Sequence, residues 1–343
     1  MSYSGEDYEN IYLNIFNALN YLNLNNFDEA MVEIRRVDHK LSVLEQKYLK
    51  ECNHYNESQK NIKFKVNKSN FHNDVLARYL SMICYKAENK VDDVIIDKEK
   101  ILKAWKTQSQ IYNYSIPPCI EKFSEKTENP CLNVLAFVGK CPIKQQSEFS
   151  IHTLENIAVI SSGFGKDYFE EFIYLPIEPD LHFKFAVPYL VFSNSQVQKV
   201  KVFKDDVLLG ELFLLENMGK VIYEVYEVKK KLVYLKAVMR SLGKSIAAHK
   251  TIKKITKGKE DTLLDIFAQI GAAAVVNLSE QADLRCWYTL PEKCLVGEFK
   301  LPTGKNTIKV KYYNNGNSVI YEEIFDIDIK ENNLNLLTSY FLK

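Results

Sequence analysis

The sequence lacks any long hydrophobic run. A membrane-spanning helix needs about 18 or more consecutive apolar residues, and the most apolar stretch, residues 263–278, is interrupted by Asp265, Gln269 and Asn277. The N-terminus, MSYSGEDYEN, is polar and acidic, and it has neither the basic start nor the apolar centre of a signal peptide. As written, the sequence therefore predicts a soluble intracellular protein.

An excess of charge of one sign is also missing. The 45 Lys and Arg residues balance the 44 Asp and Glu residues, for a net charge of +1, so no global field favours nucleic acid. The seven cysteines include no CxxC pair and no zinc-finger spacing with histidine. We therefore expect buried thiols, at least one of them outside any intramolecular disulfide, and no metal or other cofactor.

Motifs of known catalytic chemistry are absent as well. The sequence contains no HExxH, no GxSxG and no GxxxxGK[ST]. Adjacent carboxylates such as Glu170 and Glu171 point to opposite faces of a strand, which makes them poor acid–base partners. The six histidines are scattered along the chain: His39, His54, His72, His152, His182 and His249. The sequence thus predicts a protein without catalytic activity.

What the sequence does contain is a helical N-terminal region. Residues 8–24 and 27–48 each place apolar side chains on one helical face, with a break at Asn25 and Asn26. Small and aromatic residues between them fall at the offsets of a tetratricopeptide (TPR) repeat. They are Ala18, Tyr21, Asn25, Phe27, Ala30, Ile34 and Val37.

A second helical pair is expected at residues 75–87 and 91–105. Val94 takes the place of Ala30 in this pair and follows it by 64 residues (30 to 94), nearly twice the TPR period of about 34 residues. We therefore predict a TPR-like helical domain over residues 1–115.

The character of the chain changes at Ile116-Pro117-Pro118, where the proline pair predicts the end of helical structure. The β-rich runs that follow lie at residues 132–138, 157–160, 172–175, 183–192, 197–203, 207–215, 295–300, 307–313, 319–329 and 336–342. The predicted fold class is α+β, with the helical domain followed by an antiparallel β-rich domain over residues 125–343. Helical patterns at about 221–278 predict an insertion into that domain.

Four residues form the candidate partner-binding set: Asn14, Asn17, Tyr21 and Arg35. They are polar or aromatic, and we expect them to face the concave groove of the helical pair, where a protein or peptide would bind. Tyr21 has an alternative role, which is packing between the two helices.

A second candidate site consists of the alternating residues Asp283, Arg285 and Trp287, which would share one face of a strand. As a recognition motif, Arg285 would pair with a carboxylate or phosphate and Trp287 would stack on a ligand. As a structural motif, an Asp–Arg ion pair would lie under a packed Trp. The structural interpretation is preferred, and it predicts that substituting Arg285 unfolds the β-rich domain.

Two further segments have a functional and a simpler interpretation. Backbone amides around Gly163, Gly165 and Lys166 could cradle an anion, but a surface turn is the preferred interpretation. The basic run at 229–257 could form an amphipathic helix on an anionic membrane, but a solvated helix face is preferred.

Five stretches of the chain resemble an uncharacterised family of bacterial TPR-containing lipoproteins. They are residues 5–9, 30–36, 77–80, 139–144 and 282–291, and the last carries the motif Ala-Asp-x-Arg-x-Trp-x-Thr-Leu-Pro. The resemblance implies N-terminal TPR-like helices, a C-terminal β-rich region, and a periplasmic or membrane-associated location. Two features depart from the family: the lipoprotein signal with its lipid-carrying cysteine is not seen, and Leu284 and Cys286 replace smaller polar residues.

These observations lead to one preferred function and two alternatives. We predict a non-enzymatic protein-interaction scaffold of the bacterial cell envelope, with a protein or peptide partner and no nucleic acid. One alternative is an enzyme of unrecognised type with a site in the C-terminal loops at Gly163 or Arg285. The other is a peripheral membrane scaffold that uses the basic helix 229–257 on an anionic membrane surface.

Overall fold

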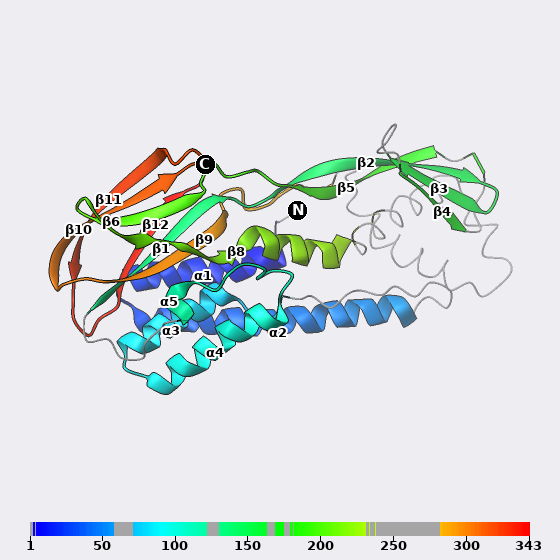
Figure 1. Ribbon diagram of the computed structural model, residues 1–343. Helices are drawn as coiled ribbons and strands as arrows, with labels where there is room; N and C mark the ends of the chain where they lie inside the picture. The colour runs from blue at the N-terminus through cyan, green and yellow to red at the C-terminus, as the bar shows by residue number, and fades with distance from the viewer. Residues whose placement is uncertain are drawn as a thin grey trace.

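The computed structural model has three layers, with a small sheet at one end (Figure 1). It describes residues 3, 5–57, 71–121, 130–162, 169–174, 179–180, 182–230, 233, 237 and 282–343. A layer of helices covers one face of sheet A, and sheet C covers the other face. Sheet B lies away from these layers and is joined to them by two long strands (Figure 1). The α+β class predicted from the sequence is confirmed.

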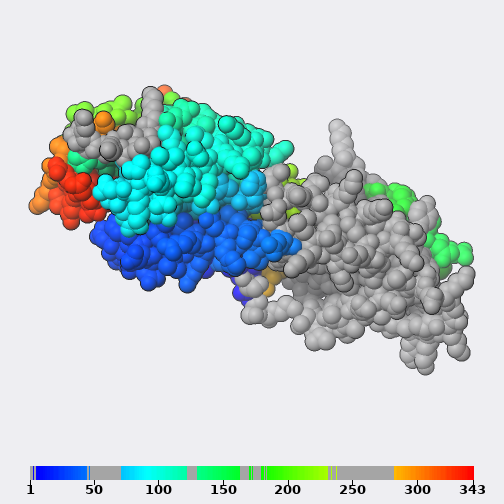
Figure 2. All heavy atoms as spheres, turned by 90° about the horizontal axis from the view of Figure 1, so that it is seen from below, coloured from blue at the N-terminus to red at the C-terminus, as the bar shows by residue number. Residues whose placement is uncertain are grey.

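The helical layer consists of two hairpins, α1 (Asp7–Asn23) with α2 (Phe27–Glu57) and α3 (Val75–Ala87) with α4 (Val91–Thr107). Figure 2 shows the two hairpins side by side on one face of the molecule, in blue and cyan. Ala18 and Ala30 are fully buried between α1 and α2, because small side chains let the helices approach closely. The asparagine-rich segment after residue 48 continues α2 as far as Glu57.

The two hairpins share one turn geometry. In the first, the Asn26 amide bonds the Tyr21 carbonyl at 2.9 Å and Asn25 has a φ of 54°. In the second, the Lys90 amide bonds the Tyr85 carbonyl at 2.9 Å and Asn89 has a φ of 58°. This is the Schellman motif, in which the residue after the helix is left-handed, a conformation that asparagine tolerates. The second turn follows the first by the same 64 residues (25 to 89) as Val94 follows Ala30.

The proline pair does not end helical structure as predicted. Pro118 opens the short helix α5 (Pro118–Glu121), because proline lacks the amide hydrogen that has no partner at the first helical position and its φ already suits a helix. The residue before it, Pro117, supplies the carbonyl that accepts the Ile120 amide at 2.9 Å.

Sheet A has the order β12-β1-β9-β8. Its strands are β1 (Cys131–Lys140), β8 (Phe213–Asn217), β9 (Pro291–Lys300) and β12 (Asn335–Phe341). The β-rich domain is not purely antiparallel, because β12 pairs with β1 in parallel, from Leu132 with Asn335 to Val138 with Phe341. A parallel pair needs a long connection, so that both strands start at the same edge of the sheet. Here almost the whole β-rich region connects β1, the first strand, to β12, the last one.

Strand β1 is buried on both faces, which explains its nearly continuous apolar sequence. Leu135 and Phe137 face the helices, whereas Val134 and Ala136 face sheet C. One of its polar residues, Asn133, accepts a hydrogen bond from the Tyr79 hydroxyl of α3 at 2.8 Å. The first core therefore joins helices and sheet A, and the second lies between the two sheets.

Sheet C has the order β11-β10-β6-β7. Its strands are β6 (Lys199–Lys204), β7 (Val207–Glu211), β10 (Gly304–Tyr313) and β11 (Val319–Ile329). The sequence predicted one strand over 207–215, but the chain leaves sheet C at Leu212 and continues in sheet A as β8. At the break, Leu212 is buried between the two sheets, and its amide still bonds the Val200 carbonyl of β6 at 2.9 Å.

Sheet B has the order β4-β3-β2-β5 and is antiparallel throughout. Its strands are β2 (Ile143–Leu154), β3 (Ile157–Ser162), β4 (Phe169–Tyr174) and β5 (His182–Val191). The sequence analysis missed β2, because its residues are mostly polar and half-exposed and lack a buried face along most of the strand.

The predicted boundary between residues 115 and 125 stays a prediction. A single apolar core includes side chains from both sides of it, among them Ile15, Tyr79, Phe137 and Val296. Residues 218–230 are helical and contribute Val221 to this core. The rest of the predicted helical insertion lies almost wholly outside the described residues.

Candidate functional site

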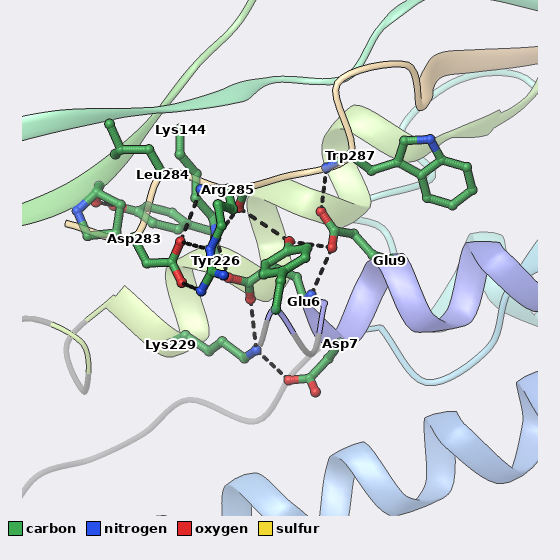
Figure 3. Close-up of polar contacts among 12 residues, drawn as sticks. Glu6, Asp7, Glu9, Lys144, Tyr226, Lys229, Asp283, Leu284, Arg285 and Trp287 are labelled. Carbon is green, nitrogen blue, oxygen red and sulfur yellow. Dashed lines mark hydrogen bonds and ion pairs between the residues drawn. The ribbon is translucent and has the colours of Figure 1, made fainter. Parts of the chain in front are cut away.

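The motif at 282–291 leads past the start of α1 into β9, and its first residues are not a strand. The Trp287 amide donates to Glu9 Oε1 at 2.6 Å, and the indole Nε1 donates to Thr289 Oγ1 at 2.9 Å. The indole ring meets Phe16 edge-on, with centroids 5.7 Å apart. The motif is thus attached to the first helix of the chain (Figure 3).

Asp283 and Arg285 do form an ion pair. Arg285 Nη2 lies 2.7 Å from Asp283 Oδ2, and Nε lies 2.9 Å from Oδ1. These hydrogen bonds lower the pKa of Asp283 to about 2. The pair lies in solvent, with 54% of the Asp283 side chain and 45% of that of Arg285 exposed, and not beneath Trp287 as the structural interpretation expected. The Arg285 guanidinium instead covers the ring of Tyr3, 4.9 Å from its centroid.

Glu6 lies between two cations that come from different parts of the chain. Its carboxylate forms ion pairs with Lys144 at the start of β2 and with Lys229 Nζ at 3.3 Å. Lys229 is also paired with Asp7. Burial favours the neutral acid, but the two ammonium groups outweigh it and lower the pKa of Glu6.

We call this group the α1 junction: Tyr3, Glu6, Asp7, Glu9, Lys144, Lys229, Asp283, Arg285 and Trp287 (Figure 3). Lys144 belongs to β2, which runs out to sheet B, and Lys229 belongs to the helical residues 218–230. Beside it, the Tyr226 hydroxyl donates to the Pro188 carbonyl of β5 at 2.8 Å. The α1 junction therefore ties the start of α1 to segments that lead to and from the far end of the molecule.

The predicted partner-binding residues do not share one surface. Asn14 is buried; its amide donates to the Glu33 carboxylate, and its Oδ1 accepts from Lys40 Nζ at 2.5 Å. It therefore serves contacts between α1 and α2. Tyr21 packs against the apolar core, Asn17 is half-buried, and Arg35 is exposed on α2.

A group that the sequence analysis missed lies deep inside the molecule. Asp74 and Glu216 are buried carboxyl groups near Tyr12 and Tyr112. Burial raises the pKa of Asp74 to about 7 and raises that of Glu216 well above its ordinary value. The sequence signal for Asp74 was its place directly before α3, where it caps the helix; Glu216 shows only as an acid in an apolar strand. Both side chains are buried, with relative exposures of 1% and 0%.

The described cysteines carry no sign of an activated nucleophile. Cys84, Cys119, Cys141, Cys286 and Cys294 are free thiols. Burial raises the pKa of Cys84 and of Cys119 to about 12, so both stay protonated near neutral pH.

His152 and His182 face each other across β2 and β5, with ring centroids 4.1 Å apart. The planes of the two rings are tilted by 32°. In the part of the chain that the structure describes, no three or more His, Cys, Asp or Glu side chains are grouped so that they could hold a metal ion.

The remaining predicted segments are only partly visible. The anion loop at Gly163, Gly165 and Lys166 lies outside the described residues. Of the basic run, Lys229 is engaged at the α1 junction and Lys230 pairs with Glu227 at 3.1 Å. Within the described ranges, none of the helices combines the length and the apolar character that crossing a membrane requires.

Comparison with known proteins gives no relative: the chain matches no protein-family model, no curated protein and no solved structure.

Proposed function

We propose that this chain is a non-enzymatic protein-interaction scaffold whose helical layer is built from two TPR-like hairpins. The observation that carries the proposal is the repeated turn. Asn25 and Asn89 both have a left-handed backbone. In each turn, the asparagine amide bonds the carbonyl three residues earlier, and the next amide bonds the carbonyl five residues before it. Repetition of one hairpin is the way in which helical-repeat proteins build binding surfaces.

The proposed binding face is the outer one, formed by α2 and α4. The inner helices α1 and α3 pack against sheet A. Phe16 of α1 contacts the ring of Phe137, and the Tyr79 hydroxyl of α3 donates to Asn133. The outer helices α2 and α4 face away from the sheets (Figure 1). Arg35 is the one member of the predicted partner-binding set that is exposed, and its charge acts on Tyr85 of the neighbouring hairpin.

A charge reversal on the outer face tests the proposal. The full-length chain is used as bait with an extract of its source organism, and the captured proteins are compared for the wild type and Arg35→Glu. We expect a reproducible protein partner that Arg35→Glu loses at least tenfold. The matched control is Lys199→Glu, which makes the same charge change at an exposed position of β6 in sheet C and should retain the partner. Equal capture by both variants, or no protein captured by the wild type, would refute the proposal.

A further inference from the structure

Three oxygen atoms without a hydrogen-bond partner are buried where α1, α3 and β8 meet. They are the Tyr12 hydroxyl, Asp74 Oδ2 and Glu216 Oε1. The three residues have relative exposures of 0%, 1% and 0%. Buried polar atoms almost always have a hydrogen-bond partner. Three such atoms without one, close together, indicate that the site holds a hydrogen-bonding group in addition to these side chains.

The other carboxyl oxygens are already bonded. Asp74 Oδ1 accepts the Ala77 amide at 2.7 Å, and Glu216 Oε2 accepts the Tyr112 hydroxyl at 2.8 Å. The Tyr112 hydroxyl also accepts the Val75 amide at 3.3 Å. Because Val75 directly follows Asp74, this hydroxyl brings Glu216 to the start of the helix that Asp74 caps.

No positive side chain among the described residues forms an ion pair with either carboxyl group. The nearest cation, Arg78, is bound to Asp38 at 2.5 Å and lies 3.6 Å from Asp97. The other titratable groups that face the pair are Asp38 of α2, Tyr12 of α1, Tyr112 and Tyr114 after α4, and Cys294 of β9. Apart from Arg78, every one of them is neutral or negative, so two ionised carboxylates would be uncompensated here.

We propose that Asp74 and Glu216 form an internal binding site for one proton, which links the packing of the helices against sheet A to pH. The proton is carried on Glu216 Oε1 and donated to Asp74 Oδ2, because Glu216 Oε2 already accepts from Tyr112. Without the added proton, these two buried carboxylate oxygens have no hydrogen-bond donor among the described residues. The Tyr12 hydroxyl lies near the pair but bonds neither carboxyl group.

The sign of the pH effect follows from proton linkage. The folded chain holds a proton that an unfolded carboxyl group, with an ordinary pKa of about 4, releases. Stability from this site is therefore complete below about pH 4 and falls as the pH rises toward the raised folded-state pKa of the carboxyl pair. Over that window, the unfolding equilibrium constant should rise about tenfold for each pH unit.

Urea unfolding of the full-length chain between pH 5 and pH 7 tests the site. Glu216→Gln replaces the protonated acid by an amide that can also donate to Asp74. We expect the unfolding constant of the wild type to rise over these two pH units about a hundredfold more than that of Glu216→Gln. Glu298→Gln is the control, because Glu298 has an ion-pair partner in Lys86 at 3.2 Å; its pH profile should run parallel to that of the wild type.

Infrared spectroscopy gives a second readout that does not depend on the variant folding. The wild type at neutral pH should show the carbonyl stretch of a protonated carboxylic acid, and Glu216→Gln should lose it. Parallel pH profiles for the wild type and Glu216→Gln would overturn the proposal. So would the absence of that band at neutral pH, or stability that rises with sodium ions at constant ionic strength, which would place a metal cation in the site instead.

Discussion

At the scale of single residues, the side chains that stand out in the sequence are not those that contribute most to stability. Arg285 is the most distinctive charge of the 282–291 motif, yet its ion pair with Asp283 is exposed, and exposed pairs contribute little. Glu9 is inconspicuous in the sequence but accepts hydrogen bonds from the Trp287 amide, the Glu6 amide and the Tyr3 hydroxyl. The buried acceptor therefore matters more than the exposed pair.

Glu9→Ala should lower the free energy of unfolding by about 2 kcal/mol, because it leaves the Trp287 and Glu6 amides without their acceptor. Arg285→Ala should cost less than about 1 kcal/mol and leave the β-rich part folded. Urea denaturation of both variants measures the difference. A larger loss in Arg285→Ala than in Glu9→Ala would contradict this ranking.

The ion pair should still be visible in titration. In the wild type, the Asp283 carboxyl should titrate at about pH 2, whereas in Arg285→Ala its pKa should rise toward the ordinary value of about 4. Because the folded-state pKa is depressed, the pair is intact above the ordinary pKa and is lost as the pH falls through about 2. Carbon NMR of the carboxyl group follows both. An unchanged Asp283 pKa in the variant would show that Arg285 does not cause the shift.

At the scale of secondary-structure elements, the helical hairpins depend on their turns, and the sheets depend on close contact between them. The left-handed asparagines Asn25 and Asn89 end α1 and α3. In sheet A, Gly297 faces Leu212 and Phe299, so closely that a Cβ atom there would lie 2.6 Å from Leu212 Cδ2. The residue type at Asn25 and Asn89 is determined by the backbone conformation, and that at Gly297 by the space available for a side chain.

Replacing either turn asparagine by a β-branched residue should destabilise the protein. Asn25→Val and Asn89→Val force a branched side chain into a left-handed conformation, at a cost of about 1–2 kcal/mol each. Asn25→Gly and Asn89→Gly are the controls and should be neutral or stabilising at this position. Thermal and urea unfolding report the effect, and equal losses for valine and glycine would exclude this role of the turns.

Gly297→Ala should cost about 1–3 kcal/mol, because the added methyl group overpacks the space between sheets A and C. Gly316→Ala, where the nearest atom is 3.4 Å away, should leave stability nearly unchanged. A neutral Gly297→Ala would show that Leu212 and Phe299 move aside freely.

At the scale of the whole molecule, the helical layer and the sheets stabilise each other. The apolar core includes residues from α1 and α3 together with β1, β8 and β9. The α1 junction adds ion pairs from Glu6 to Lys144 and Lys229. The other apolar face of sheet A is already covered by sheet C.

A fragment of residues 1–115 should therefore not fold as the full chain does. The inner faces of α1 and α3 would expose Phe16 and Tyr79, which contact β1 in the intact protein. We expect the fragment to bind hydrophobic dyes and to lack a cooperative thermal transition. A fragment with a sharp transition and no dye binding would establish the helical layer as an independent domain.

Loosening the α1 junction should affect distant segments together. In Glu6→Ala, hydrogen exchange should accelerate in residues 218–230 and 282–290 alike, because Glu6 joins Lys229 and Lys144, and Lys144 in turn bonds the Arg285 carbonyl. Glu227→Ala, which removes only a local pair with Lys230, is the control and should not change exchange in 282–290. Acceleration confined to α1 would show that the α1 junction does not couple these segments.

The sequence predicted well those features that depend on near neighbours. The bounds of α3 were predicted correctly, since Asp74 caps its start and an apolar periodicity runs through it. The sequence analysis also separated the β-rich runs 197–203 and 207–215, and the structure has the turn between β6 and β7 there, with a φ of 52° at Asp205. The polar strand β2 gave no such signal and was missed.

By itself, the sequence determined the helical hairpins, their turns and most strands, because periodicity, caps and left-handed asparagines act over a few residues. Only the tertiary structure decided that β12 lies parallel to β1, that sheet A covers the inner helices, and that Glu9 receives Trp287. It also brought Asp74 and Glu216 to one helix start, although 142 residues separate them (74 to 216). Such pairings depend on burial shared between distant segments, and no local pattern in the chain encodes them.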